Sequence, residues 1–214
     1  HYNITTDIVG PLSFPQTSTH GISNSEQSET IKVQVPRPLK PTLLLSDEMT
    51  FAADGSVTGG IASRTVVPSA PLDGGAYSFS AWVKCSNPSG NLPRIFDLGT
   101  GQDDDNVFLT FTTAKMYYRV RHGSTGQTPI ITADSFPSNT WVLVQLIHRA
   151  DLTVSIYWNG IKKVAGSSPL PLITGRTWYL GKSHWVNDAV FSGAMKEVAF
   201  FNGEADIKTL PSYG

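Results

Sequence analysis

The chain has 214 residues, of which 40% are hydrophobic and 15% are charged, and its formal net charge is −1. The hydrophobic fraction is enough for a sizeable core, whereas the nearly balanced charge argues against a nucleic-acid binder that neutralises phosphates. No run approaches the 18 consecutive apolar residues of a membrane span, so we expect no membrane insertion. The single cysteine, Cys85, excludes an intrachain disulfide and a cysteine-based zinc cluster.

Residues 1–30 lack a sustained hydrophobic period and are rich in Ser, Thr, Asn and Gln. This composition favours an irregular extension or linker, and it places the predicted folded domain at residues 31–214. Because the chain starts at His1 rather than Met, we expect it to be a fragment or a mature product of a longer precursor. Residues 31–35 (IKVQV) alternate strictly and predict the first strand, which the prolines that follow would end.

Further along the chain, short apolar or alternating segments recur about every ten residues, with Gly, Pro, Asn or Asp between them. This rhythm is typical of an antiparallel β-sandwich. Asn159-Gly160 predicts a type I′ hairpin, because both positions of that turn need a positive φ. No long helix is expected, although residues 204–214 allow a single turn. We predict strands within residues 42–46, 76–85, 94–101, 106–114, 115–123, 140–149, 152–166, 177–183 and 191–203.

The predicted strand at 115–123 has two faces of opposite character. Its alternate positions hold Met116, Tyr118 and Val120 on one face and Tyr117, Arg119 and Arg121 on the other. The first set suits the core, and the second suits a solvated sheet face. Aromatic rings stack on the apolar faces of sugars, and Arg offers five planar donors, so the second set is a candidate site for a glycan or an acidic sugar. An ordinary exposed strand would show the same pattern.

An aromatic and polar segment separates the last two predicted strands. It holds His184, Trp185 and Asn187, and Asp188 follows as a candidate turn cap. Tryptophan is common in binding hot spots, so the first three residues are candidate contacts for a sugar or a protein. The alternative is that Trp185 plugs the end of the sandwich and that the segment is only a turn.

One dense acidic group occurs in the chain, at residues 103–106. Calcium takes several oxygen ligands from one loop, so Asp103, Asp105 and Asn106 are candidate calcium ligands at the rim of the domain. The spacing does not match an EF-hand loop. The alternative is a solvated hairpin turn, in which Asp and Asn are common.

Signatures of the common enzyme classes are missing from the sequence. It contains no P-loop, no Gly-x-Ser-x-Gly elbow and no dinucleotide-binding fingerprint. Glycoside hydrolysis needs two carboxylates that face each other across the sugar bond. Glu204 and Asp206 are two residues apart, but they lie near a predicted turn at the end of the domain. We therefore expect no catalytic activity.

Four segments resemble, in order, the motifs of laminin G-like, concanavalin A-type jelly rolls. They are AYSFSAWVKC, RIFDLGTGQDDDNVFLTF, TWVLVQLIHRADLTVSIYWNG and the closing YLGKSHWVNDAVFSGAMKEVAFFNGEADIKTL, and together they span roughly residues 49–210. The resemblance implies a concanavalin A-like sandwich, an extracellular location, a glycan or protein ligand and, in some members, a calcium ion at the rim. Lys196 and Glu197 stand where the family commonly has an acidic pair, which argues against a calcium site at those positions.

We therefore predict an all-β protein with an irregular N-terminal extension and a concanavalin A-like jelly roll. It would be a non-catalytic module that recognises a glycan or glycoprotein through rim loops and one sheet face. We expect an extracellular or surface-exposed location, as a secreted protein, in cell adhesion or on a virion. The alternative is a structural or attachment domain of a surface or virion assembly, in contact with other subunits or other copies of itself.

Overall fold

The computed structural model describes residues 40–59, 72, 74–172, 177–207 and 210, all within one unit of the chain, Arg37–Gly214. The predicted strand at 31–35 and the predicted boundary at residue 30 lie outside these residues. The described residues contain no helix, and so none long and apolar enough to cross a membrane. Their strands are β1 (Leu43–Leu45), β2 (Met49–Phe51), β3 (Val57–Thr58), β4 (Tyr77–Cys85), β5 (Arg94–Gly99), β6 (Val107–Thr112), β7 (Lys115–His122), β8 (Thr125–Gly126), β9 (Ile130–Ser135), β10 (Val142–His148), β11 (Thr153–Trp158), β12 (Ile161–Ser167), β13 (Thr177–Leu180) and β14 (Gly193–Asn202).

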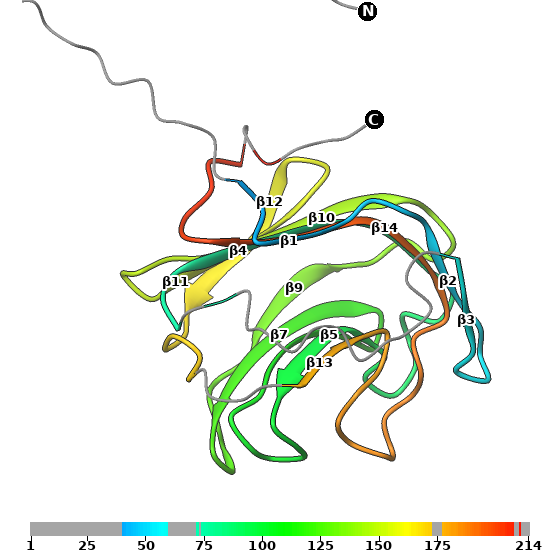
Figure 1. Cartoon of the computed structure of the whole chain (residues 1–214), viewed down its shortest axis with the longest axis horizontal. Coiled ribbons are helices and arrows are strands. Elements are labelled where there is room, and N and C mark those ends of the chain that lie inside the picture. The colour runs from blue at the N-terminus through cyan, green and yellow to red at the C-terminus, as the bar shows by residue number, and fades with distance from the viewer. Residues whose placement is uncertain (1–39, 60–71, 73, 173–176, 208–209, 211–214) are drawn as a thin grey trace, which may run out of the picture. The chain divides into compact units, whose positions relative to one another are not determined.

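The strands form two antiparallel sheets that lie face to face as a sandwich (Figure 1). Sheet A has the order β12-β11-β10-β4-β14-β2-β3, and β1 also pairs with β14. Sheet B has the order β13-β5-β6-β7-β8, and β9 also pairs with β7. The predicted antiparallel β-sandwich is confirmed.

The core between the sheets follows from the period-two alternation of the strands. Tyr77, Phe79, Ala81 and Val83 of β4 are all fully buried, as are the alternate residues Met116, Tyr118 and Val120 of β7. Aromatic rings fill the centre, where Phe79, Phe96 and Phe200 lie with centroids 4.9–5.4 Å apart. The faces of β7 therefore point as the sequence predicts, with Tyr117, Arg119 and Arg121 on the outside.

The predicted hairpin joins β11 to β12, and Asn159 and Gly160 both have a positive φ, at 50° and 76°. The prediction of a type I′ dipeptide is confirmed in this respect. Strands β2, β3, β8 and β9 were not predicted. Three of them have only two or three residues, and β9 (IITADS) has large hydrophobic residues only at its first two positions, so it shows no alternation.

A polar chain crosses the otherwise apolar core. The hydroxyls of Tyr77 and Tyr118 lie 2.9 Å apart, and the Tyr118 hydroxyl lies 2.8 Å from His148 Nδ1. His148 Nε2 lies 2.9 Å from the Ser168 carbonyl oxygen, which can only accept, so the geometry assigns the proton to Nε2. Burial lowers the pKa of His148, although the bond to Ser168 opposes this. The histidine is therefore a structural, neutral side chain.

Part of the outer face of sheet A is covered by an apolar segment. Ile147, Ala199 and Phe201 point outward from β10 and β14, and they pack against Ala205 and Leu210. These apolar contacts exclude water from that part of the sheet. Ser78 Oγ also holds the segment, because it accepts from the Ala205 N–H at 2.9 Å and donates to the Gly203 carbonyl oxygen at 3.0 Å.

Candidate functional site

The outer face of sheet B carries charged and aromatic side chains from three neighbouring strands. Phe108 on β6 lies directly opposite Arg119 on β7. On β5, Arg94 and Asp97 also face outward, although residues three apart in a regular strand point to opposite faces. The register between β5 and β6 shifts between Arg94 and Phe96, and this bulge turns both charged side chains to the same face.

Asp97 is the centre of a buried polar network beneath this surface, and it is fully inaccessible to solvent. Its Oδ1 accepts a hydrogen bond from Asn106 Nδ2 at 3.1 Å and lies 3.1 Å from His184 Nδ1. Its Oδ2 accepts from Arg94 Nε at 3.3 Å and from the His184 backbone N–H at 3.1 Å. These three hydrogen-bond donors and the adjacent His184 ring offset the carboxylate's loss of hydration.

Opposing effects act on the pKa of Asp97 in this network. Burial alone would raise this pKa, but the contact with His184 and the positive charge of Arg94 outweigh burial and hold the pKa below its usual value. Arg94 is also fixed by Asp188, whose Oδ2 lies 2.7 Å from Arg94 Nη2. Arg94 is therefore a buried cation with two carboxylate partners.

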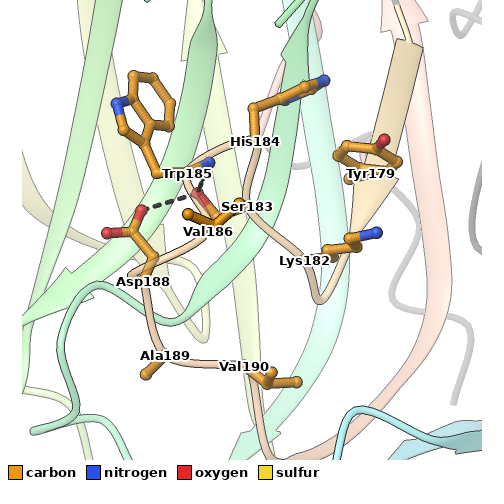
Figure 2. Close-up of a pocket in the computed structure, with 9 residues that line it drawn as sticks. All are labelled: Tyr179, Lys182, Ser183, His184, Trp185, Val186, Asp188, Ala189 and Val190. Carbon is orange, nitrogen blue, oxygen red and sulfur yellow. Dashed lines mark hydrogen bonds between the residues drawn. The ribbon is translucent and has the colours of Figure 1, made fainter. Parts of the chain in front are cut away.

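Residues 182–190, called here the covering loop, run from β13 across the outer face of sheet B (Figures 1 and 2). Ser183 closes the loop on itself: its hydroxyl donates to Asp188 Oδ2 at 2.7 Å and accepts from the Trp185 backbone N–H at 3.0 Å, as the dashed lines in Figure 2 show. Together with the bonds to Asp97 and Arg94, these contacts anchor the loop to the sheet.

Trp185 packs on the sheet face and stays half-exposed. Its ring meets the Phe108 ring edge-on, with centroids 5.7 Å apart, and Phe108 stacks on Tyr117 at 6.0 Å and 5°. The guanidinium carbons of Arg94 and Arg121 lie 5.3 Å and 5.8 Å from the Trp185 ring centroid. Trp185 therefore lies on the outer face of sheet B and forms one wall of an aromatic and cationic surface.

Two hollows flank the covering loop and share Trp185 and Asp188. The β7 hollow has a volume of about 130 Å³ and is lined mainly by Arg94, Phe108, Tyr117, Arg119, Arg121 and Trp185. The loop hollow has a volume of about 310 Å³ and is lined mainly by Tyr179, Lys182, His184, Trp185, Val186 and Val190 (Figure 2). Both combine ring faces with polar groups, as sites for small ligands do.

In the loop hollow, the Tyr179 and His184 rings lie 4.4 Å apart, and Lys182 Nζ lies 4.9 Å from the Tyr179 centroid. His184 Nε2 is buried and has no hydrogen-bond partner. Val186, at the tip of the loop, has 90% of its surface exposed. The hollow therefore has an aromatic wall, one ammonium group and an apolar rim.

Five of the six predicted ligand-binding residues come together around these hollows. Tyr117, Arg119, Arg121 and Trp185 line the β7 hollow, and His184 and Trp185 line the loop hollow. Asn187 is exposed and lines neither, and its carbonyl oxygen accepts a hydrogen bond from Asn91 Nδ2 at 3.1 Å.

The predicted calcium ligands have other partners. Asp103 Oδ1 lies 2.7 Å from Arg121 Nη2, and Asp105 Oδ1 accepts from the Gly123 N–H at 2.6 Å. Asn106 is buried in the Asp97 network. Within the described residues, no three His, Cys, Asp or Glu side chains gather in a way that could hold a metal. Calcium at this turn stays a prediction, and a melting midpoint that rises with Ca²⁺ and falls again with chelator would confirm it.

Sequence reasoning missed Arg94, the buried Asp97 that binds it, and Phe108, and it also missed Tyr179 and Lys182 of the loop hollow. Arg94 and Phe108 line the β7 hollow. A signal for the first two is present in the sequence, because RIFDLG places two charged residues inside an otherwise apolar strand. Charged residues are rarely buried without a partner, so such a pair indicates a buried ion pair.

A laminin G family model, described as the concanavalin A-like lectin/glucanases superfamily, matches residues 58–206, which is well over half of the chain. The chain belongs to this superfamily. The resemblance seen in the sequence is therefore confirmed. None of the curated proteins matches the chain.

Solved structures of this superfamily type share the fold. Domain 4 of AbnA, a GH43 extracellular arabinanase from Geobacillus stearothermophilus, solved with arabinotriose, is 15% identical with a TM-score of 0.55, over 81% of this chain and 97% of that one. The ligand-binding domain of botulinum neurotoxin serotype D, solved with N-acetylneuraminic acid, is 12% identical with a TM-score of 0.52, over 77% of this chain and 40% of that one. The binding domain of botulinum neurotoxin DC, solved with rat synaptotagmin II, is 15% identical with a TM-score of 0.52, over 76% and 41%. At these identities the likeness shows the fold alone.

Proposed function

We propose that this concanavalin A-like domain is a non-catalytic module that binds a glycan, free or on a glycoprotein, across the covering loop and the outer face of β7. One observation carries the proposal: residues far apart in the sequence, Tyr117 and Arg119 on β7 and Trp185 on the loop, line a single hollow. The rings of Phe108, Tyr117 and Trp185 offer stacking surfaces, and the arginines offer directional donors for hydroxyl groups.

The polar contacts that anchor the covering loop support a role in ligand binding, beyond shielding the sheet from water. A loop held by Asp97 and Arg94 keeps Trp185 in place before a ligand arrives, and preorganised contacts lose less entropy on binding. Solved domains of the same fold with arabinotriose and with N-acetylneuraminic acid are in keeping with a sugar ligand. We propose an extracellular or surface-exposed location on the same grounds.

The absence of paired carboxylates supports a non-catalytic role. Among the described residues that line the two hollows, Asp188 alone carries a carboxylate, and that carboxylate binds Arg94. Common glycoside hydrolases use two carboxyl groups on opposite sides of the scissile bond. Measured turnover of any glycoside would contradict this part of the proposal.

A glycan array tests the proposal with the wild type, Trp185→Ala and the matched control Trp141→Ala. Trp141 is also half-buried, but it lies near Lys84 and Lys196 of sheet A, away from the two hollows. We expect Trp185→Ala to weaken binding about tenfold or more, as truncation of a hot-spot tryptophan does, and Trp141→Ala to leave it unchanged.

A second candidate is an attachment domain that contacts protein, for which the exposed Val186 beside Trp185 is the favouring observation. Light scattering tests it. A stable oligomer, together with no glycan bound by the wild type, would favour attachment over glycan binding.

A further inference from the structure

Three arginines line the β7 hollow, and two of them form ion pairs with acidic side chains. Arg94 pairs with Asp97 and Asp188, at 3.3 Å and 2.7 Å. Arg121 pairs with Asp103 at 2.7 Å. Two of the three guanidinium groups therefore have carboxylate partners before any ligand arrives.

Arg119 differs from both. Its Nε donates to the Gln127 carbonyl oxygen at 2.8 Å, and its Nη1 donates to the Tyr117 hydroxyl at 3.2 Å. Both acceptors are neutral, and no ion pair joins Arg119 to a carboxylate within the described part of the chain. An Arg side chain has five N–H donors, so three of them remain for a ligand.

Gly126 leaves room for the guanidinium group of Arg119 to lie against the backbone. Gly126 lies beneath its guanidinium, and a Cβ added to Gly126 would fall 2.3 Å from Nη2 and 2.5 Å from Cζ. A side chain at this position would displace the guanidinium, which is the flexible end of Arg119. The bond to Gln127 orients the planar group further, so the remaining donors are held in place rather than free to rotate.

From this arrangement we propose that the β7 hollow selects a sugar that carries a carboxylate, of the uronic or sialic type, and that Arg119 is the residue that reads the carboxylate. This inference rests on the proposed glycan-binding function. A planar fork of N–H donors binds a carboxylate bidentately, and the neighbouring rings of Phe108 and Tyr117 take the apolar face of the sugar.

The acidic turn makes one end of the β7 hollow less favourable for an anion than the other end. Asp103 and Asp105 lie at the Arg121 end of the row, because they contact Arg121 and Gly123. They repel a carboxylate there and leave the Arg119 and Tyr117 end as the favourable one. On the other side of Trp185, Lys182 is a second cation without a carboxylate partner among the described residues.

Calorimetry with matched sugar pairs tests the inference. The probes are oligomers of galacturonic and glucuronic acid and sialyl-lactose, each beside its methyl ester, which keeps the sugar and removes the charge. For at least one pair we expect the acid to bind about tenfold tighter or more than the ester. We expect Arg119→Gln to abolish the difference. Arg149→Gln, a half-buried arginine at the end of β10, should preserve it.

A second variant, Gly126→Ala, keeps the positive charge of Arg119 but displaces its guanidinium group. Gly126→Ala places a methyl group where the guanidinium lies, so it should also lose the acid preference while Arg119 remains present. Melting curves check that each variant is folded. If Arg119→Gln fails to fold, Gly126→Ala and Arg119→Lys, which removes the fork, carry the test.

Equal affinity for acid and ester in every pair, or a preference that survives both Arg119→Gln and Gly126→Ala, would overturn the inference. A sulfated neutral sugar that binds tighter than every carboxylate would do the same. If neutral sugars bind and Trp185→Ala abolishes that binding, the proposed function stands and the acid selectivity fails. If no sugar binds, both fail.

Discussion

The two sheets differ in how their outer faces are covered. On sheet A, Ala205 and Leu210 seal Ile147, Ala199 and Phe201 through apolar contacts. On sheet B, the covering loop is tied to Asp97 and Arg94 by buried charges and leaves two hollows beside Trp185. Apolar contacts are not directional, so the side chains pack tightly and exclude water. Hydrogen bonds and ion pairs fix the positions of particular atoms, and the surface between those atoms can stay open. This contrast supports the proposal that sheet B carries the binding surface.

Removing the centre of the polar network should have the largest effect. Asp97→Ala leaves Arg94 and His184 buried without their shared carboxylate, and breaking one partner of a buried pair costs about 3–5 kcal/mol of unfolding free energy. Urea denaturation measures this loss. We also expect weaker glycan binding, because the covering loop loses its anchor. A loss under about 1 kcal/mol would show that the network is not what holds the loop.

Truncating the apolar cover should cost less and leave function intact. Leu210→Ala removes a side chain that is 4% exposed, and such truncations typically cost about 2–5 kcal/mol, of which we expect the lower end at this peripheral cluster. The same urea titration gives the stability. Glycan affinity should match that of the wild type, and a clear loss of affinity would remove the functional distinction between the two sheets.

Acid should destabilise the domain in two steps. Burial lowers the pKa of His148 in the folded protein. As the pH falls, His148 is therefore protonated in the unfolded chain at a higher pH than in the folded protein, and the free energy of unfolding decreases below about pH 6.5. The pKa of Asp97 is also lowered, so its contribution is present above about 3.9 and is lost as pH falls further through the folded-state value.

Urea titrations between pH 8 and pH 3 should show both steps in the free energy of unfolding. Each step has a slope of at most about 1.4 kcal/mol per pH unit for one proton. Asp97→Asn should reduce the lower step, to which Asp54 and Asp151 also contribute because their pKa values are lowered too. His148→Gln should remove the upper step. A wild-type midpoint that stays constant from pH 7 to pH 5 would contradict the account of His148.

The smallest effect concerns the core between the sheets. Cys85 is fully buried, and burial raises the pKa of its thiol to about 12, so the reactive thiolate is absent at neutral pH. We expect a disulfide reagent to leave Cys85 unmodified in the native protein over an hour and to modify it fully in guanidinium. Rapid native labelling would mean that the sandwich opens at the end of β4.

Much of the fold could be predicted because alternation reports directly on burial. It assigned both faces of β7, and Asn159-Gly160 marked the hairpin between β11 and β12. The Asp97 network could not be predicted, because the bulge that turns Arg94 and Asp97 to one face depends on the pairing of β5 with β6. The sequence also suggested β7 and Trp185 as two separate candidate sites. Both contact Phe108 only in the folded protein, and a tertiary contact of this kind has no signal in the sequence.

Chemical-shift mapping of a bound glycan tests the central claim most directly. The ¹⁵N-labelled domain would be titrated with the tightest-binding sugar from the array. The account predicts that the shifted amides cluster on β6, on β7 around Arg119 and on the covering loop around Trp185. Shifts confined to the outer face of sheet A, around Trp82 and Trp141, would contradict it.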